Sequence, residues 1–342
     1  MKLGLQMGYW GAGPPQDAIQ TIQHAERLGF DSVWTSEAYG SDAISPIAWW
    51  GAHTSKIRLG TAIMQISARR PTATAMTAMT LDHLSGGRFT LGLGVSGPGV
   101  VQGWYGETFS SPLMHTREYL EIIRRVIKRQ EPVSFDGRFY QIPFNTSDVT
   151  LKPLRSTVHP LRDDLGIYLA AEGPKNVELA AEIADGWFPL WFSPRSDAYY
   201  RARLESGFVR RPNPLATYNF EVVCPVPVVI DRDLESAADK LRPLLALYIG
   251  GMGSTTTNFH KRVFERLGYE EQCKKIQDAY LAGRKSEAIS GVTTEMVEDV
   301  SLVGSLGKIR DDLDKWRETV ITTMLVSNFG GELDTIAELV LG

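Results

Sequence analysis

Short apolar runs alternate with amphipathic stretches along the chain, and glycine or serine stands at most of their junctions. In the first unit an apolar run leads through a loop to apolar residues at positions 18, 19, 22, 25 and 28, the spacing of a helix that Gly29 would end. The runs predict eight strands, over residues 3–5, 31–36, 57–63, 89–95, 166–171, 187–191, 220–230 and 323–327. Eight strand and helix units favour a (β/α)8 TIM barrel. A doubly wound sheet is the alternative, but no G-x-G-x-x-G motif opens a helix after the first strand.

Two stretches do not fit the minimal barrel, and we interpret them as insertions into a single domain over residues 1–342. The first, over residues 132–164, is predicted to be a hairpin that turns at Asp136 and Gly137, followed by an aperiodic loop. The second, over residues 250–306, opens with a glycine-rich polar run that is too flexible for an element interior, and continues as short helices. A glycine-rich entry into helices indicates a lid over the barrel or a dimer contact.

The fourth predicted strand is the most informative part of the chain. Gly92 and Gly94 alternate there with large apolar residues, so that one face of the strand has no side chains and another group can approach its backbone closely. The strand opens into a small polar loop at Ser96 and Gly97. Because α/β enzymes carry their chemistry at the carboxyl ends of parallel strands, we expect the functional site at this end of the barrel.

Composition excludes several classes of function. The chain of 342 residues is 43% hydrophobic and 22% charged, with a net charge of −4 and no basic run, so nucleic-acid binding is not expected. No apolar run approaches the length of about 20 residues that a membrane span requires. Two cysteines and an amino terminus that enters a strand directly indicate a cytoplasmic protein. The six histidines lack metal-binding spacing, and no Gly-x-Ser-x-Gly motif supports a serine nucleophile.

Five segments together carry a family resemblance. They are GFDSVWTSEAYGSD at 29–42, IRLGTAIMQISARRP at 57–71, LDHLSGGRFTLGLGVSGP at 81–98, TREYLEIIRRVI at 116–127 with its VSFDGRFYQI hairpin, and LAAEGPKNVELAAEIADGW at 169–187. The chain resembles, from end to end, the bacterial luciferase-like superfamily of TIM barrels, and in particular its branch of oxidoreductases that use the deazaflavin coenzyme F420. The segments are less specific for the cofactor, because enzymes of this superfamily that use flavin mononucleotide (FMN) share most of them.

Glu37 places a carboxylate after the second strand, at the predicted mouth of the barrel. The residue is either a hydrogen-bond partner and proton relay for a ring system or a solvated loop residue, and the resemblance implies the first role. Several relatives follow this acid with a catalytic histidine, whereas Ala38 follows it here, so sugar-phosphate dehydrogenase activity is not expected. Other relatives place a catalytic glutamate after the fourth strand, where this chain has Pro98, which leaves the proton donor open.

The resemblance also implies cofactor contacts from the third and fourth strands. A non-prolyl cis peptide is implied at Ala62–Ile63, where it would support the ring from behind, and an ordinary trans strand is the alternative. Beyond it, Gln65 and Ser67 are candidates to hydrogen-bond the ring edge. Ser96 and Gly97 match a loop that contacts the cofactor.

The segment from Glu172 through Gly173 and Pro174 to Lys175 joins the fifth strand to a helix. Free amides and the positive end of the helix dipole form an anion site, so a cofactor phosphate fits there, with a simple capped helix start as the alternative. The resemblance favours the phosphate. The pair Arg69–Arg70 is either solvated or placed to bind the oligoglutamate tail of F420.

Aromatic residues gather at the predicted mouth, and those not in the core would line a flat apolar substrate slot. We expect Tyr9, Trp10, Tyr39, Trp187 and Trp191 in this slot. The sequence therefore predicts an F420-dependent oxidoreductase that transfers a hydride between reduced deazaflavin and an apolar or conjugated small molecule. The alternatives are an FMN monooxygenase working with a separate reductase, and a non-catalytic deazaflavin or flavin carrier. The resemblance also implies a homodimer.

Overall fold

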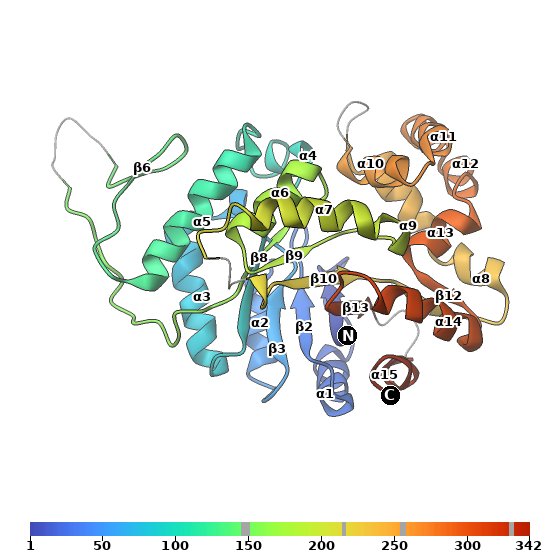
Figure 1. Cartoon of the computed structure of the whole chain (residues 1–342), viewed down its shortest axis with the longest axis horizontal. Coiled ribbons are helices and arrows are strands. Elements are labelled where there is room, and N and C mark those ends of the chain that lie inside the picture. Colours follow the sequence, from blue (N-terminus) through green and yellow to red (C-terminus); the bar gives the residue numbers. More distant parts are fainter. Residues whose placement is uncertain (145–150, 214–216, 254–257, 328–331) are drawn as a thin grey trace.

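A closed barrel of eight parallel strands forms the centre of the molecule (Figure 1). This computed structural model describes residues 1–144, 151–213, 217–253, 258–327 and 332–342. The barrel strands, in spatial order, are β1 (Lys2–Gly8), β2 (Ser32–Thr35), β3 (Arg58–Thr61) continued by β4 (Met64–Gln65), β5 (Phe89–Gly94), β8 (Ile167–Ala170), β9 (Gly186–Phe188), β10 (Glu221–Pro225) and β13 (Thr323–Ser327). Pairing of β3 with β5 and of β13 with β1 closes the ring, which confirms the predicted TIM barrel.

Helices surround the barrel on its outside. They are α1 (Ala18–Leu28), α2 (Ile44–Gly51), α3 (Pro71–Ser85), α5 (Pro112–Lys128), α6 (Pro174–Ile183), α7 (Asp197–Phe208), α14 (Leu306–Arg317) and α15 (Leu333–Leu341). Gly29 ends α1 and Gly86 ends α3, with φ angles of 89° and 66° that a residue with a side chain rarely adopts. The predicted helix stop at Gly29 is therefore confirmed. None of the helices in the described ranges is long and apolar enough to cross a membrane.

The first insertion follows α5 and projects from one end of the molecule, at the left of Figure 1. As predicted, it contains an antiparallel hairpin, made of β6 (Phe135–Asp136) and β7 (Gln141–Ile142). The turn predicted at Asp136 and Gly137 is misplaced, because Asp136 pairs with Gln141 inside the hairpin and the loop covers residues 137–140. Within the described part of the loop that follows, residues 151–164 form no helix and only one isolated bridge, between Leu154 and Val133. A short helix, α4 (Pro98–Val101), precedes α5 at the carboxyl end of β5.

The strand predicted over residues 220–230 is wrong in one respect, because the structure divides it in two. Only β10 belongs to the barrel, whereas β11 (Val228–Ile230) pairs in parallel with β12 (Leu302–Gly304) in a separate small sheet. Proline has no N–H for a strand ladder, and Pro225 and Pro227 stand at the break.

Helices between β11 and β12 form the second insertion, which lies at the opposite end from the hairpin (Figure 1). They pack around an apolar core of their own, distinct from the main core between barrel and outer helices. In order they are α8 (Leu234–Asp239), α9 (Arg242–Ala246), the π-helical turn η4 (Leu247–Gly251), α10 (Phe259–Arg266), α11 (Glu270–Leu281), α12 (Lys285–Ser290) and α13 (Thr294–Val300).

The glycine-rich entry to this insertion is partly helical, contrary to our expectation. Gly250 and Gly251 lie inside η4, where a Cβ on Gly250 would come within 2.5 Å of the Tyr280 Cβ. Glycine is therefore required there for close packing on α11 rather than for flexibility. The rest of the predicted polar run, at 254–257, lies outside the described residues.

Charged side chains close the barrel at its amino end. Glu221, at the start of β10, receives hydrogen bonds from Lys2 Nζ at 2.6 Å and from Arg58 Nη2 at 3.0 Å. Burial alone would raise the pKa of Glu221, but the two cations outweigh it, and the pKa lies below its ordinary value. Above this network, Trp34, Tyr168 and Phe188 pack together inside the barrel.

Candidate active site

The link between β3 and β4 bulges toward the barrel interior at the carboxyl end of the strands. The Ala62–Ile63 peptide bond is cis, as the family resemblance implies. A Cβ on Gly92 would stand 1.7 Å from the Thr61 carbonyl oxygen, and one on Gly94 would stand 2.8 Å from the Ile63 side chain. The face of β5 without side chains therefore accommodates the bulge. A neighbouring strand, and not a ligand, makes the close approach that the glycines predict.

Glu37 is buried and joins three segments at the barrel mouth. Its carboxylate accepts hydrogen bonds from the backbone N–H of Ala43 at 3.1 Å, from the backbone N–H of Gln65 at 2.8 Å and from Arg69 Nη1 at 2.6 Å. These bonds hold the loop after β2 against β4 and the start of α3. Contact between Glu37 and a cofactor ring stays a prediction, and so does its role as a proton relay.

Several buried polar atoms near the bulge have no hydrogen-bond partner among the described residues. Gln65 donates its amide to the Glu37 and Ala38 carbonyl oxygens, which leaves its own Oε1 unpaired. Ser67 Oγ, Gln6 Oε1 and Trp10 Nε1 are in the same condition. Since unpaired buried polar atoms are costly, these acceptors and donors fit a bound heterocycle with its own N–H and C=O groups. Contact of Gln65 and Ser67 with a cofactor ring stays a prediction.

The loop between β8 and α6 presents an open helix start. Gly173 is the N-cap of α6 and makes no side-chain capping bond, and no atom lies within 4 Å of where its Cβ would be. Pro174 occupies the first turn, and Lys175 is exposed beside it. The next residue, Asn176, lines a small cavity under β5 and α5. This end of α6 is therefore open to an anion, and phosphate binding there stays a prediction.

The aromatic residues that were expected to line one substrate slot lie in different places, and one of them does not belong to it. Tyr9 and Tyr39 are exposed, with ring centroids 6.3 Å apart, whereas Trp191 is buried against Tyr248 of η4 at 5.1 Å. Trp187 is fully buried in the main core, and its Nε1 donates to the Ala171 carbonyl at 2.8 Å. Placing Trp187 in a substrate slot was therefore wrong, because its side chain packs outward against the helices.

Glu172 has a partner that sequence reasoning missed. Its Oε1 lies 2.6 Å from Nδ1 of His260 on α10, and Arg266 Nη2 donates to its backbone carbonyl at 3.2 Å. The Tyr248 ring lies 4.8 Å from the His260 ring. The second insertion thus meets the barrel mouth at the β8–α6 loop. No local pattern indicated this contact, because the histidine lacks any motif and lies 88 residues from the glutamate.

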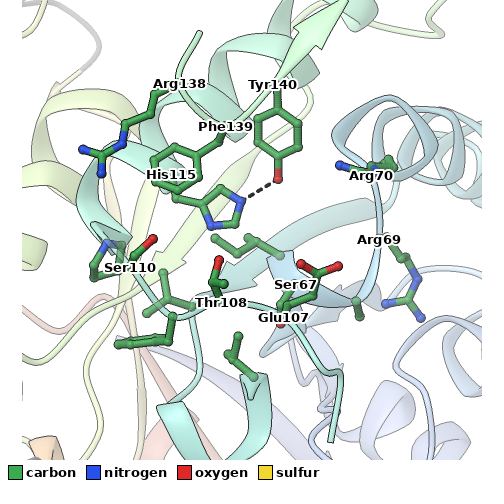
Figure 2. A pocket seen from close by; sticks show the side chains of 16 residues that line it. Ser67, Arg69, Arg70, Glu107, Thr108, Ser110, His115, Arg138, Phe139 and Tyr140 are labelled. Carbon is green, nitrogen blue, oxygen red and sulfur yellow. Dashed lines mark hydrogen bonds between the residues drawn. The ribbon is translucent and has the colours of Figure 1, made fainter. Parts of the chain in front are cut away.

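An open cavity of about 360 Å³ lies between the barrel mouth and the hairpin (Figure 2). Figure 2 shows Arg70 and Arg138 on opposite sides of a His115–Tyr140 pair, whose Nε2 and hydroxyl oxygen are 2.6 Å apart. Burial lowers the pKa of His115, so the His115 ring is neutral at physiological pH. Ser67 belongs to the same lining and connects the cavity to the bulge.

The sequence indicated Arg69 and Arg70 but not Arg138. The Arg69 guanidinium is turned to Glu37, with which it forms a buried ion pair, so its charge is already balanced. Arg70 and Arg138 supply the positive charge of the cavity, opposed by Glu107 alone among its lining residues. Among the described residues no three His, Cys, Asp or Glu side chains gather as a metal site.

The chain has relatives both in sequence and in structure. A Mycobacterium tuberculosis protein with the provisional name coenzyme F420-dependent oxidoreductase is 47% identical over 99% of this chain and 98% of its own length. A 5,10-methylenetetrahydromethanopterin reductase of Archaeoglobus fulgidus is 25% identical over 90% of this chain and 88% of its own. The solved coenzyme F420-dependent tetrahydromethanopterin reductase of Methanopyrus kandleri superposes with a TM-score of 0.81 at 24% identity, covering 99% of this chain and 96% of the other.

The family model for luciferase-like monooxygenases matches residues 4–323, which span every barrel strand except the first residues of β1 and most of β13. With the closed barrel and the cis bulge at its mouth already described, the chain belongs to the luciferase-like monooxygenase family.

Proposed function

We propose that this protein is a coenzyme F420-dependent oxidoreductase acting on an apolar or conjugated small molecule. The main support for the proposal is that one residue, Ser67, belongs both to the region of the bulge and to the cavity. This residue lies both among the unpaired buried polar atoms near the cis bulge and in the lining of the cationic cavity. A ring at the bulge could therefore continue into an anionic tail beside Arg70 and Arg138. The 47% identical relative supports the same assignment.

The residues of the chain have separate tasks in this proposal. The deazaflavin, when bound, supplies or accepts the hydride. Ile63 and the cis bulge support one face of the ring, while Gln65 and Ser67 supply the polar contacts. The loop at Ser96 and Gly97 is the remaining predicted cofactor contact, and Ser96 adopts a left-handed φ of 56° there.

Phosphate and substrate would occupy different parts of the mouth. Gly173, Pro174 and Lys175 would hold the phosphate through the open start of α6. Tyr9 and Tyr39 offer two exposed rings above the β1 and β2 ends, which suits a flat apolar substrate.

Turnover tests this function directly. Purified protein is mixed with reduced F420 and a panel of ketones, imines and enones, and oxidation of the deazaflavin is followed by absorbance; the reverse assay uses oxidised F420 and alcohols. The proposal expects oxidation of the deazaflavin that depends on one substrate class. No turnover in either direction would favour a carrier that binds without catalysis.

The family match also supports a second function, FMN-dependent monooxygenation with electrons from a separate reductase. The open start of α6 would hold the FMN phosphate equally well. This alternative predicts oxygen consumption with reduced FMN and a substrate, and it gives the cationic cavity no task.

We further propose that the protein is a homodimer. Met76 and Leu84 on α3 and Trp49 on α2 are 60%, 74% and 61% exposed, an unusual outward display of large apolar side chains. Sedimentation velocity of the wild-type protein and of Leu84→Glu tests this, with a shift from dimer to monomer expected for the variant. A monomeric wild-type protein would contradict it.

A further inference from the structure

The Glu172–His260 pair stands at the junction of the barrel and the second insertion, and the proposed cofactor contacts leave it without a task. Glu172 Oε1 meets His260 Nδ1 at 2.6 Å, and the two side chains are only 12% and 21% exposed. Glu172 Oε2 is buried and has no hydrogen-bond partner among the described residues. A carboxylate on Nδ1 fixes the hydrogen on that nitrogen and turns Nε2 away from it, as the group able to exchange a proton.

Glu172 lies just beyond β8, and the last residue of this strand is close to Gly94, which the cis bulge also contacts. Glu172 follows β8 by two residues, and a Cβ on Gly94 would stand 3.5 Å from the Ala170 Cβ and 2.8 Å from Ile63. On the other side, His260 contacts the ring of Tyr248, which in turn contacts Trp191. Tyr248 also lies close enough to Tyr9 and Tyr39 for their hydroxyl groups to raise its pKa, so the imidazole and the carboxylate stand beside the two exposed rings of the proposed substrate site.

The other charged and titratable groups nearby leave the imidazole free to act. Burial raises the pKa of Tyr248 to about 12, so this neighbour is neutral at physiological pH. Arg266 donates to the Glu172 backbone carbonyl, and Lys261 pairs with Glu265 at 3.3 Å and donates to Gln277. Glu172 is therefore the charged group in direct contact with the ring of His260.

We propose that His260 is the proton donor and acceptor of the reaction and that Glu172 is its positioning residue; this inference rests on the proposed function. When a carbonyl or imine carbon accepts the hydride, the π electrons move to the heteroatom, which takes a proton from Nε2 of the doubly protonated His260 ring while Nδ1 keeps its hydrogen on Glu172. The substrate gains two electrons and two hydrogens, the deazaflavin loses two electrons, and the imidazole recovers its proton from water. In alcohol oxidation the same nitrogen takes the hydroxyl proton.

Two variants test the assignment. His260→Asn should lower kcat by about 100-fold or more, the range of general acid catalysis, with cofactor affinity within about threefold of wild type. The pH profile of kcat/KM should differ between this variant and the wild type. Glu172→Gln should lower kcat by about tenfold through a poorly oriented ring. His24→Asn is the matched control, because His24 forms a similar pair with Asp334 at 2.8 Å on the outer helices and should leave turnover unchanged.

A second measurement needs no cofactor and no turnover. Nitrogen NMR of histidine-labelled protein should show the hydrogen of neutral His260 on Nδ1 in the wild type and on Nε2 in Glu172→Leu, whose side chain offers no acceptor to Nδ1. The same tautomer in both proteins, or a His260→Asn protein with wild-type kcat and pH profile, would overturn the inference. Failure of the wild type to bind or oxidise any deazaflavin would instead overturn the proposed function, while the tautomer result would stand by itself.

Discussion

Glu37 and Arg69 form a buried ion pair, with 2.6 Å between Oε1 and Nη1 and only 3% of the Glu37 side chain exposed. The same oxygen accepts the backbone N–H of Gln65, so one carboxylate fixes both the end of β4 and the entry to α3. A residue that resembles a catalytic acid in sequence thus has a clear structural task. The two tasks are separable by experiment.

Glu37→Gln should destabilise the protein by about 3 kcal/mol, because it leaves the Arg69 charge buried without a counter-charge. The free energy of unfolding is measured by urea titration. Glu121→Gln is the control, since Glu121 pairs with Arg125 on the exposed face of α5 and its loss should cost less than about 0.5 kcal/mol. Equal effects of the two substitutions would contradict a structural role for Glu37.

Gly94→Ala should weaken cofactor binding by roughly tenfold, because the added methyl forces the Ile63 side chain, 2.8 Å from the new Cβ, out of place on the bulge. Fluorescence titration of the apo-protein measures the affinity. Gly307→Ala serves for comparison, since no atom lies within 4 Å of its added Cβ. Unchanged affinity in Gly94→Ala would show that the ring does not rest on Ile63.

The protein should become less stable as the pH falls, because Glu221 is then protonated. Its folded-state pKa is lowered by Arg58 and Lys2 in spite of burial, so its contribution is present above the unfolded pKa of about 4.3 and lost as pH falls through the lower folded value. Hydrogen bonds to charged groups suggest a contribution of roughly 2 kcal/mol. Urea midpoints are compared for wild type and Glu221→Gln between about pH 7 and pH 3. A constant difference across this range would refute the linkage.

The cationic cavity should recognise the tail of the cofactor. Arg138→Ala should weaken binding of F420 by about fivefold, whereas binding of a deazaflavin without the glutamate tail should not change, because Arg138 lines only the cavity. The affinities are measured by fluorescence titration at low and high salt. Arg27→Ala, on the exposed face of α1, is the control. Equal losses for both ligands would place the tail elsewhere.

Local sequence patterns predicted most of the fold. The eighth strand has the predicted bounds, Thr323–Ser327, and β5 ends one residue earlier than predicted, at Gly94. The predicted strand at 220–230 failed at Pro225 and Pro227, where hydrophobic patterning continues but the hydrogen-bond ladder cannot.

The site was less predictable, because contacts between distant segments decide it. The cis bond at Ala62–Ile63 came from family resemblance alone, since nothing in the local residues requires it. Gly92 and Gly94 indicated a close approach, but only the folded barrel shows that Thr61 and Ile63 make it. His260 carries no motif at all, and its pairing with Glu172 arises from the packing of the second insertion.

Coenzyme F420 is the proposed cofactor, and a parallel titration of the apo-protein with F420 and with FMN distinguishes the two. Quenching of tryptophan fluorescence reports binding, because Trp10 lies two residues beyond the carboxyl end of β1, at the mouth of the barrel. Our account predicts saturable, tight binding of F420 and at least about tenfold weaker binding of FMN, a difference of about 1.4 kcal/mol. Preference for FMN, or binding of neither, would contradict it.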